Sequence, residues 1–287
     1  HTFQGALVTG GAGASSAGLV SSNCGNMTST ASTFTGGDGT QSSAGAELSR
    51  MTFTSTGDAF LAGGTQQDSA GVRMTGGVLT ATGITAVGGI NSGTSPSIGE
   101  RQTAGVWLVD AMVGTTGSSL TGGTATGGSV MAGVTARSVG LLVESATNAT
   151  VRNMAVNGLT AQGGVSSGLS AGMAVRTRVE ESQVLLSTLR GGAGAVSTGL
   201  FVQTRAGNGL RRFTAVRNTI TSAALTAAGT TSAGVQMLTA CVECTINRNI
   251  ITAGNAAVTS TGFQMNVPGT LADVTYVTTV SYTHLRA

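Results

Sequence analysis

Apolar residues recur along this chain at fixed positions relative to a repeated glycine. A small residue, then Gly, then an apolar residue occurs nine times, at intervals of 26 to 35 residues. Repeats of this length with some variation are typical of solenoids whose loops differ from coil to coil. The glycines are Gly18, Gly45, Gly71, Gly105, Gly140, Gly172, Gly199, Gly234 and Gly262.

The residues after each glycine alternate with a period of two. The first is apolar in all nine units, and the third is apolar in eight of them. This period places both columns on one face of a β-strand. We therefore expect Val143, Val175, Val202 and Met237 to be buried and stacked on one another. The mixed column between them is expected to face outward. It comprises Val20, Glu47, Arg73, Trp107, Leu142, Ala174, Phe201, Gln236 and Gln264.

A second apolar-rich strand and a glycine-rich turn complete most units, as in residues 148–156 and 163–168. An Asn follows an Arg near this strand in three units, at Arg152-Asn153, Arg217-Asn218 and Arg248-Asn249. The layout resembles the right-handed parallel β-helix of pectate-lyase-like proteins. This resemblance implies Asn side chains that stack at one corner and bond from coil to coil. Because several coils lack the Asn, an ordinary turn Asn in a left-handed conformation is the alternative interpretation.

We predict an all-β fold, a right-handed parallel β-helix of about nine coils, forming one domain over residues 1–279. The chain of 287 residues contains 40% hydrophobic but only 3% aromatic residues, and 46 glycines. Such small side chains fill a narrow solenoid core better than a wide globular one. Disorder, a trimeric adhesin and an antiparallel β-sandwich are the alternatives. A calcium-binding β-roll would need many GGxGxD repeats, and residues 36–39 are a single partial match.

Both ends of the sequence indicate a fragment. The chain starts at His1 rather than Met and has no visible signal peptide. The last eight residues, Val280 to Ala287, resemble a translated sequencing-library adaptor, so residues 280–287 are interpreted as a non-native tail with few contacts to the helix. No apolar run is long enough to span a membrane. The basic residues are all Arg and form no cluster that indicates nucleic-acid binding.

The residue types that support catalysis are sparse. Histidine occurs at positions 1 and 284 only, so a nucleophile–His pair within the repeats is excluded. The 11 acidic residues are scattered along the chain. We therefore predict no catalytic residue, no metal site and no cofactor. Cys241 and Cys244 have the spacing for a local disulfide, with two free thiols as the alternative.

The outward column offers the best candidate binding surface. Exposed aromatic side chains with polar neighbours can stack on sugar rings or contact a partner protein. Burial under a loop or a terminal segment is the alternative. We also expect ion pairs between neighbouring coils, Glu47 with Arg73 and Glu144 with Arg176. The candidate ligand-binding residues are Arg73, Trp107, Glu144, Arg176, Phe201 and Gln203.

These observations favour a structural or adhesive scaffold, extracellular or on a cell surface, that presents a binding surface and has no catalysis of its own. Its expected partners are a polysaccharide or a surface protein. The alternative is a polysaccharide lyase or glycoside hydrolase of the parallel β-helix type, which would need carboxylates grouped in one groove.

Overall fold

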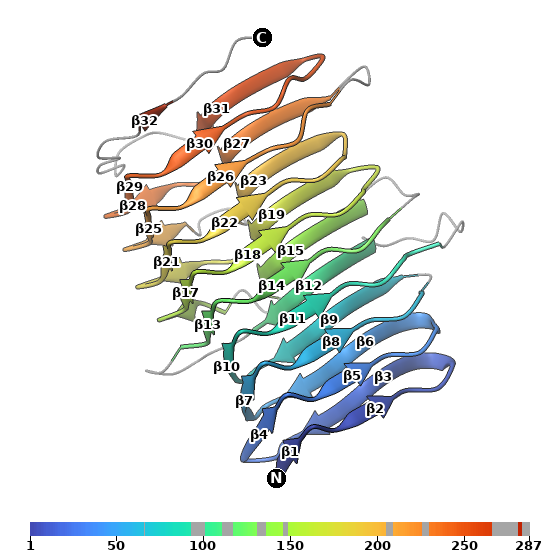
Figure 1. Cartoon of the computed structure of the whole chain (residues 1–287). Helices are drawn as coiled ribbons and strands as arrows, with labels where there is room; N and C mark the ends of the chain where they lie inside the picture. Colours follow the sequence, from blue (N-terminus) through green and yellow to red (C-terminus); the bar gives the residue numbers. More distant parts are fainter. Residues whose placement is uncertain are drawn as a thin grey trace.

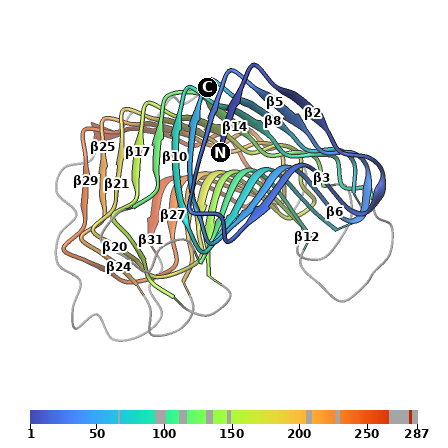
Figure 2. The same ribbon diagram turned by 90° about the horizontal axis from the view of Figure 1, so that it is seen from below.

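A computed structural model of the chain describes residues 1–65, 67–92, 101–110, 117–130, 136–145, 149–204, 209–225, 230–265 and 281–282. Among these residues the regular elements are all β-strands, which pair in parallel to form a β-solenoid (Figure 1). Each coil contributes one strand to each of three long sheets, here named A, B and C. In the later coils a short strand of a fourth sheet, D, lies between C and A along the chain. Figure 2 looks along the stack, with the sheets seen end-on.

The strands of each sheet follow one another in chain order. Sheet A contains β1 (Thr2–Gln4), β4 (Asn26–Thr30), β7 (Thr52–Thr56), β10 (Val78–Thr82), β13 (Ser119–Thr121), β17 (Ala155–Asn157), β21 (Gln183–Leu185), β25 (Thr214–Val216) and β29 (Thr245–Asn247). Sheet B contains β2 (Leu7–Thr9), β5 (Thr33–Thr35), β8 (Ala59–Leu61), β11 (Thr85–Val87), β14 (Thr124–Thr126), β18 (Thr160–Gln162), β22 (Thr188–Arg190), β26 (Thr219–Thr221), β30 (Ile250–Thr252) and β32 (Ser281–Tyr282).

Sheet C contains β3 (Gly13–Ser22), β6 (Gly39–Ser49), β9 (Asp68–Thr75), β12 (Arg101–Val109), β15 (Ala136–Glu144), β19 (Leu169–Val175), β23 (Val196–Val202), β27 (Thr231–Met237) and β31 (Thr259–Met265). Sheet D contains β16 (Val151–Arg152), β20 (Val179–Glu180), β24 (Leu210–Arg211) and β28 (Cys241–Val242).

Sheet C consists of the nine glycine-anchored strands, one per coil, which gives about eight full turns. Neighbouring anchors are in register, since Leu141 of β15 lies opposite Met173 of β19, and Val143 lies opposite Val175. Val143, Val175, Val202 and Met237 are each 0% exposed. The predicted all-β parallel β-helix and its inward columns are therefore confirmed.

The anchor glycines are required by close packing between sheets C and B. A Cβ on Gly105 would overlap the backbone of Ala125 and Thr126 in β14, and the same holds at most other anchors. The side-chain alternation breaks at this point. Ala104, before the glycine, belongs to the apolar cluster on the outer face of sheet C, whereas Val106, after it, lies in the main core.

The core of the first coils contains larger side chains than the composition led us to expect. Phe34 stacks on Phe60 with ring centroids 5.3 Å apart, and both are 0% exposed. Phe3 and Phe53 contact this pair edge-on, at 5.6 and 6.2 Å. Four of the seven phenylalanines of the chain thus fill this end of the narrow interior.

The corner between sheets A and B contains a left-handed residue in every coil, for example Gly57 with φ 64° and Arg217 with φ 56°. In the later coils the polar residue after it takes part in a ladder of hydrogen bonds. The side-chain oxygen of Asn218 accepts from the Ser187 N–H at 2.8 Å, and that of Asn249 accepts from the Asn218 N–H at 2.8 Å. The expected Asn ladder therefore exists across two coils, and Ser187 replaces Asn in the coil before them.

Asn153 does not belong to this ladder. It lies at the corner between β16 and β17, where it has φ 54°. The expectation that all three Arg-Asn motifs share one corner is therefore wrong, because the first motif follows a sheet D strand and the other two follow sheet A strands.

A serine two residues before the anchor glycine links the turns of neighbouring coils. The Ser43 hydroxyl donates to the Gly37 carbonyl of its own coil at 2.8 Å and accepts from the Gly63 N–H of the next coil at 2.7 Å. Ser170 forms the same pair of bonds with Gly164 and Gly192. These bonds satisfy backbone groups that the turn between sheets B and C would otherwise leave unpaired.

Part of the C-terminal octamer contacts the solenoid. Ser281 and Tyr282 form β32, which pairs in parallel with β30. The expectation of few contacts for this octamer stays a prediction, because the rest of residues 280–287 lie outside the described part of the chain.

Candidate functional site

The outer face of sheet C, opposite the core, contains four of the predicted binding residues in one connected chain. The Arg73 guanidinium lies over the Trp107 ring, 4.6 Å from its centroid. The Trp107 Nε1–H donates to Glu144 Oε1 at 2.9 Å. Glu144 Oε2 in turn accepts from Arg176 Nη1 at 3.0 Å. One residue from each of β9, β12 and β15, together with Arg176 directly after β19, thus forms a connected chain across four coils.

The aromatic residues on this face are buried rather than exposed. Trp107 is 3% exposed and Phe201 is 6% exposed. Leu142 and Ala174, which lie between them in the same column, are 0% exposed. The expectation of exposed aromatics is therefore wrong. Because Arg73 covers the Trp107 ring and Glu144 occupies its N–H, Trp107 is fixed as a packed side chain.

The two expected ion pairs differ in outcome. Glu144 and Arg176 form one, with side chains 15% and 19% exposed. Glu47 and Arg73 lie opposite each other on β6 and β9 as predicted. However, Glu47 and Arg73 form no ion pair in the described part of the chain, because Arg73 packs on Trp107 instead. The Arg73 Nε atom is buried and has no hydrogen-bond partner.

The other two predicted binding residues, Phe201 and Gln203, line a cavity of about 300 Å³ farther along the same face. Ala136, Arg137, Gly168, Leu169, Val196, Gln236 and Leu238 complete its lining. Gln236 is 8% exposed, and its Nε2 donates to Gln264 Oε1 at 3.0 Å. Its own Oε1 is buried without a hydrogen-bond partner. Arg137, Leu169 and Leu238 were missed because they fall outside the column that we followed.

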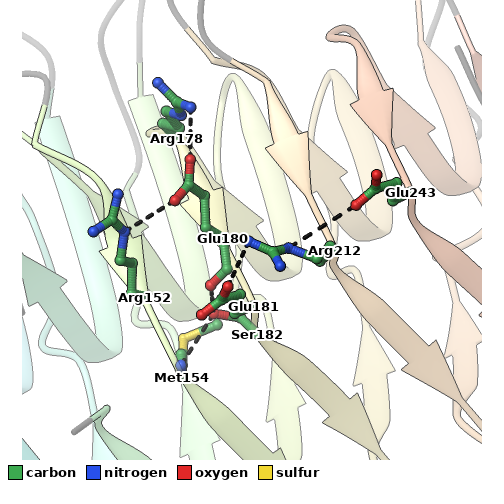
Figure 3. A network of polar contacts seen from close by, with 8 residues as sticks. All are labelled: Arg152, Met154, Arg178, Glu180, Glu181, Ser182, Arg212 and Glu243. Carbon is green, nitrogen blue, oxygen red and sulfur yellow. Dashed lines mark hydrogen bonds and ion pairs between the residues drawn. The ribbon is translucent and has the colours of Figure 1, made fainter. Parts of the chain in front are cut away.

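A second polar cluster lies where sheet D meets sheet A (Figure 3). The Glu180 carboxylate, 6% exposed, forms ion pairs with Arg152 at 2.9 Å and Arg178 at 2.6 Å. Its neighbour Glu181, 41% exposed, pairs with Arg212 at 2.5 Å. Burial acts to raise the pKa of Glu180, but the charges and hydrogen bonds of Arg178 and Arg152 outweigh it and hold the pKa below the ordinary range. In the sequence Arg178 lies two residues from Glu180, whereas Arg152 and Arg212 lie about one coil away from their partners.

Cys241 and Cys244 form a disulfide beside the core, and each is 4% exposed. Among the described residues, no three His, Cys, Asp or Glu side chains are grouped in a way that could hold a metal ion. Within the same residues, no helix has the length and apolarity needed to cross a membrane.

The fold and these contacts define the class of the protein as a parallel β-solenoid with a partly buried, mixed polar and aromatic face. No known family and no curated protein matches the sequence. Among solved structures, the crystal structure of Dettilon tailspike protein (gp208) aligns with 85% of this chain at 9% identity and a TM-score of 0.24. The alignment covers 62% of the tailspike chain.

Proposed function

We propose that this protein is an extracellular scaffold that binds a carbohydrate on the outer face of sheet C without transforming it. The observation that supports this proposal is the cavity of about 300 Å³ between β15, β19, β23 and β27. Its volume is at the lower end of those typical of small-molecule sites, which suits one or two sugar rings. A rigid solenoid holds such a site on strands rather than on loops.

The lining of the cavity has the chemistry that a sugar requires. Phe201 and Leu238 provide an apolar wall for the C–H face of a sugar ring, and Gln203 and Arg137 provide polar groups beside it. The buried Gln236 Oε1 has no hydrogen-bond partner, which is costly in a protein interior. A ligand hydroxyl that donates to this oxygen would recover the lost hydrogen bond.

The absence of catalysis in this proposal rests on the carboxylates of the same face. Glycoside hydrolysis needs two carboxyl groups flanking the scissile bond, one of which must exchange a proton. Both oxygens of Glu144 are occupied, by the Trp107 N–H and by Arg176, which restricts the movement of the carboxylate. The residues that the structure describes around the cavity include no carboxylate.

An extracellular location is supported by the disulfide between Cys241 and Cys244. Disulfides persist in oxidising compartments and are rare where thiols are kept reduced.

The test is a binding screen of the purified chain against neutral and acidic polysaccharides, followed by titration calorimetry with Gln203→Ala. We expect affinity to fall about two- to tenfold, as for the loss of one hydrogen bond of about 0.5–1.5 kcal/mol. Gln183→Ala is the matched control, because Gln183 is also an exposed strand-edge glutamine but lies on sheet A. Equal affinity of both variants would place the ligand elsewhere. Turnover of any polysaccharide that one carboxylate substitution abolishes, such as Asp110→Asn, would contradict a purely binding role.

A further inference from the structure

The outward face of sheet A presents a regular array of hydroxyl side chains in its first half. Strands β4, β7, β10 and β13 each place at least two of them outward, separated by one inward residue. The strands are in exact register, so that Thr28, Thr54, Thr80 and Ser119 form one row, and Thr30, Thr56, Thr82 and Thr121 form a second. Thr2 of β1 extends the first row by one coil.

The array has a defined spacing in two directions. Neighbouring strands lie about 4.8 Å apart and alternate residues along a strand lie about 6.7 Å apart, as in any parallel sheet. Threonine is β-branched and therefore stiff at χ1, so each threonine position repeats the same methyl and hydroxyl pair in nearly the same place, and Ser119 provides the hydroxyl alone. Apart from a bond of 3.1 Å between the Thr28 and Thr2 hydroxyls, no bond to the rest of the described chain occupies the hydroxyls of these two rows.

The strands that carry the array are uncharged, although the exposed Arg50 precedes β7 and the buried Asp58 follows it. None of the nine strands of sheet A contains a charged residue. At the adjoining corner with sheet B, the left-handed positions of the first coils are Gly or Ala, such as Ala31, Gly57 and Gly83, so no long side chain projects beside the face. The charged residues of Figure 3 lie instead at the sheet D corner of the later coils.

We propose that this threonine face binds crystalline water, that is, the surface of ice. A flexible soluble ligand gains no affinity from identical groups repeated in two directions. A crystal lattice, in contrast, contacts all of these groups at once, so that many weak contacts add up to a large binding free energy. Hexagonal ice repeats its oxygen positions at distances close to both spacings of the array. The lack of charge on the whole sheet suits a neutral lattice of water molecules. The inference is independent of the sheet C cavity.

The experiment measures thermal hysteresis and inhibition of ice recrystallisation with the purified full chain. We expect faceted ice crystals and arrested recrystallisation at micromolar protein. Thr54→Lys, which puts a long charged side chain in the centre of the array, should lower the hysteresis by at least about fivefold because the matched contacts are lost together. Thr214→Lys is the control: Thr214 is half-buried like Thr54, faces outward on the same sheet and lies outside the array. It should retain activity within about twofold, as expected of a surface change elsewhere.

Circular dichroism checks that each variant is folded, and Thr56→Lys, at an exposed position, replaces Thr54→Lys if the latter does not fold. A wild-type chain that leaves ice growth unchanged would overturn the proposal. Activity retained in a folded Thr54→Lys or Thr56→Lys variant would do the same. Retention of the wild type on crystalline cellulose or chitin, without any effect on ice, would assign the face to a polysaccharide lattice instead.

Discussion

The Glu180 cluster provides a sharp test of how this solenoid uses charge. We consider Glu180→Gln, which keeps the shape of the side chain but removes its charge. The carboxylate is 6% exposed and forms two ion pairs, with Arg152 at 2.9 Å and Arg178 at 2.6 Å. Each hydrogen bond to a charged group contributes about 1.5–3 kcal/mol. The amide keeps one acceptor, and both guanidinium groups are about half exposed and regain water. We therefore expect a net loss of about 1–3 kcal/mol.

Glu181 is the matched control, because it is the adjacent residue and also pairs with an Arg. Its carboxylate and its partner Arg212 are 41% and 48% exposed. Exposed pairs of this kind contribute about 0–1 kcal/mol, so Glu181→Gln should be close to neutral. Urea unfolding followed by circular dichroism compares the variants, provided that the slope with denaturant is unchanged. Equal stabilities of the two variants would refute the assignment of Glu180 as a buried, stabilising charge.

The effect of pH has a defined sign. The pKa of Glu180 is held below its ordinary range, so the folded state binds this proton more weakly than the unfolded state does. The stabilisation is therefore present above the unfolded-state pKa of a Glu, about 4.3, and is lost as the pH falls through the folded-state pKa. The difference between wild type and Glu180→Gln should shrink as the pH is lowered below about 4.3. A difference that stays constant down to pH values near 3 would contradict this account.

Three further substitutions test the fold. Val175→Asp should prevent folding, because it buries an unpaired charge at a position with 0% exposure; a soluble variant with an unchanged melting temperature would refute the placement. Asn218→Ala should lower the free energy of unfolding by about 2–4 kcal/mol, because it breaks three hydrogen bonds at a buried corner. The control is Asn157→Ala at an exposed position, which should lower it by less than about 0.5 kcal/mol in the same urea assay. Changing Cys241 and Cys244 together to Ser should cost roughly 2 kcal/mol, and an unchanged midpoint would show that the short disulfide loop adds no stability.

The register of sheet C could be predicted from the sequence because two independent patterns coincide there. The glycine marks where the backbone of sheet C approaches sheet B, and the apolar residues after it have the strand period. A shift of one residue would have moved Val143 and its equivalents to the outer face, so the pattern permits a single register. The serine two residues before eight of the nine anchor glycines was equally visible, but a hydroxyl that bonds to turns in two coils leaves no hydrophobic pattern.

The burial of the outer face could not be predicted in the same way. Trp107 and Phe201 share a column with Glu47, Arg73 and Gln236, and such a mixture is typical of an exposed surface. Burial here depends on contacts between coils, such as Arg73 over Trp107, and on columns beside the one that we followed. Distances along the sequence between these partners vary with the loops, so no fixed period relates them.

The two proposed surfaces can be separated because they lie on different sheets of the solenoid. The threonine array lies on sheet A from β4 to β13, whereas the cavity lies on sheet C from β15 to β27. The array contributes no side chain to the cavity lining. A substitution in one surface therefore changes the other only through global unfolding, which circular dichroism detects. Loss of carbohydrate binding with ice activity intact, or the reverse, would assign each activity to its own sheet, whereas parallel loss in folded variants would mean that one surface serves both.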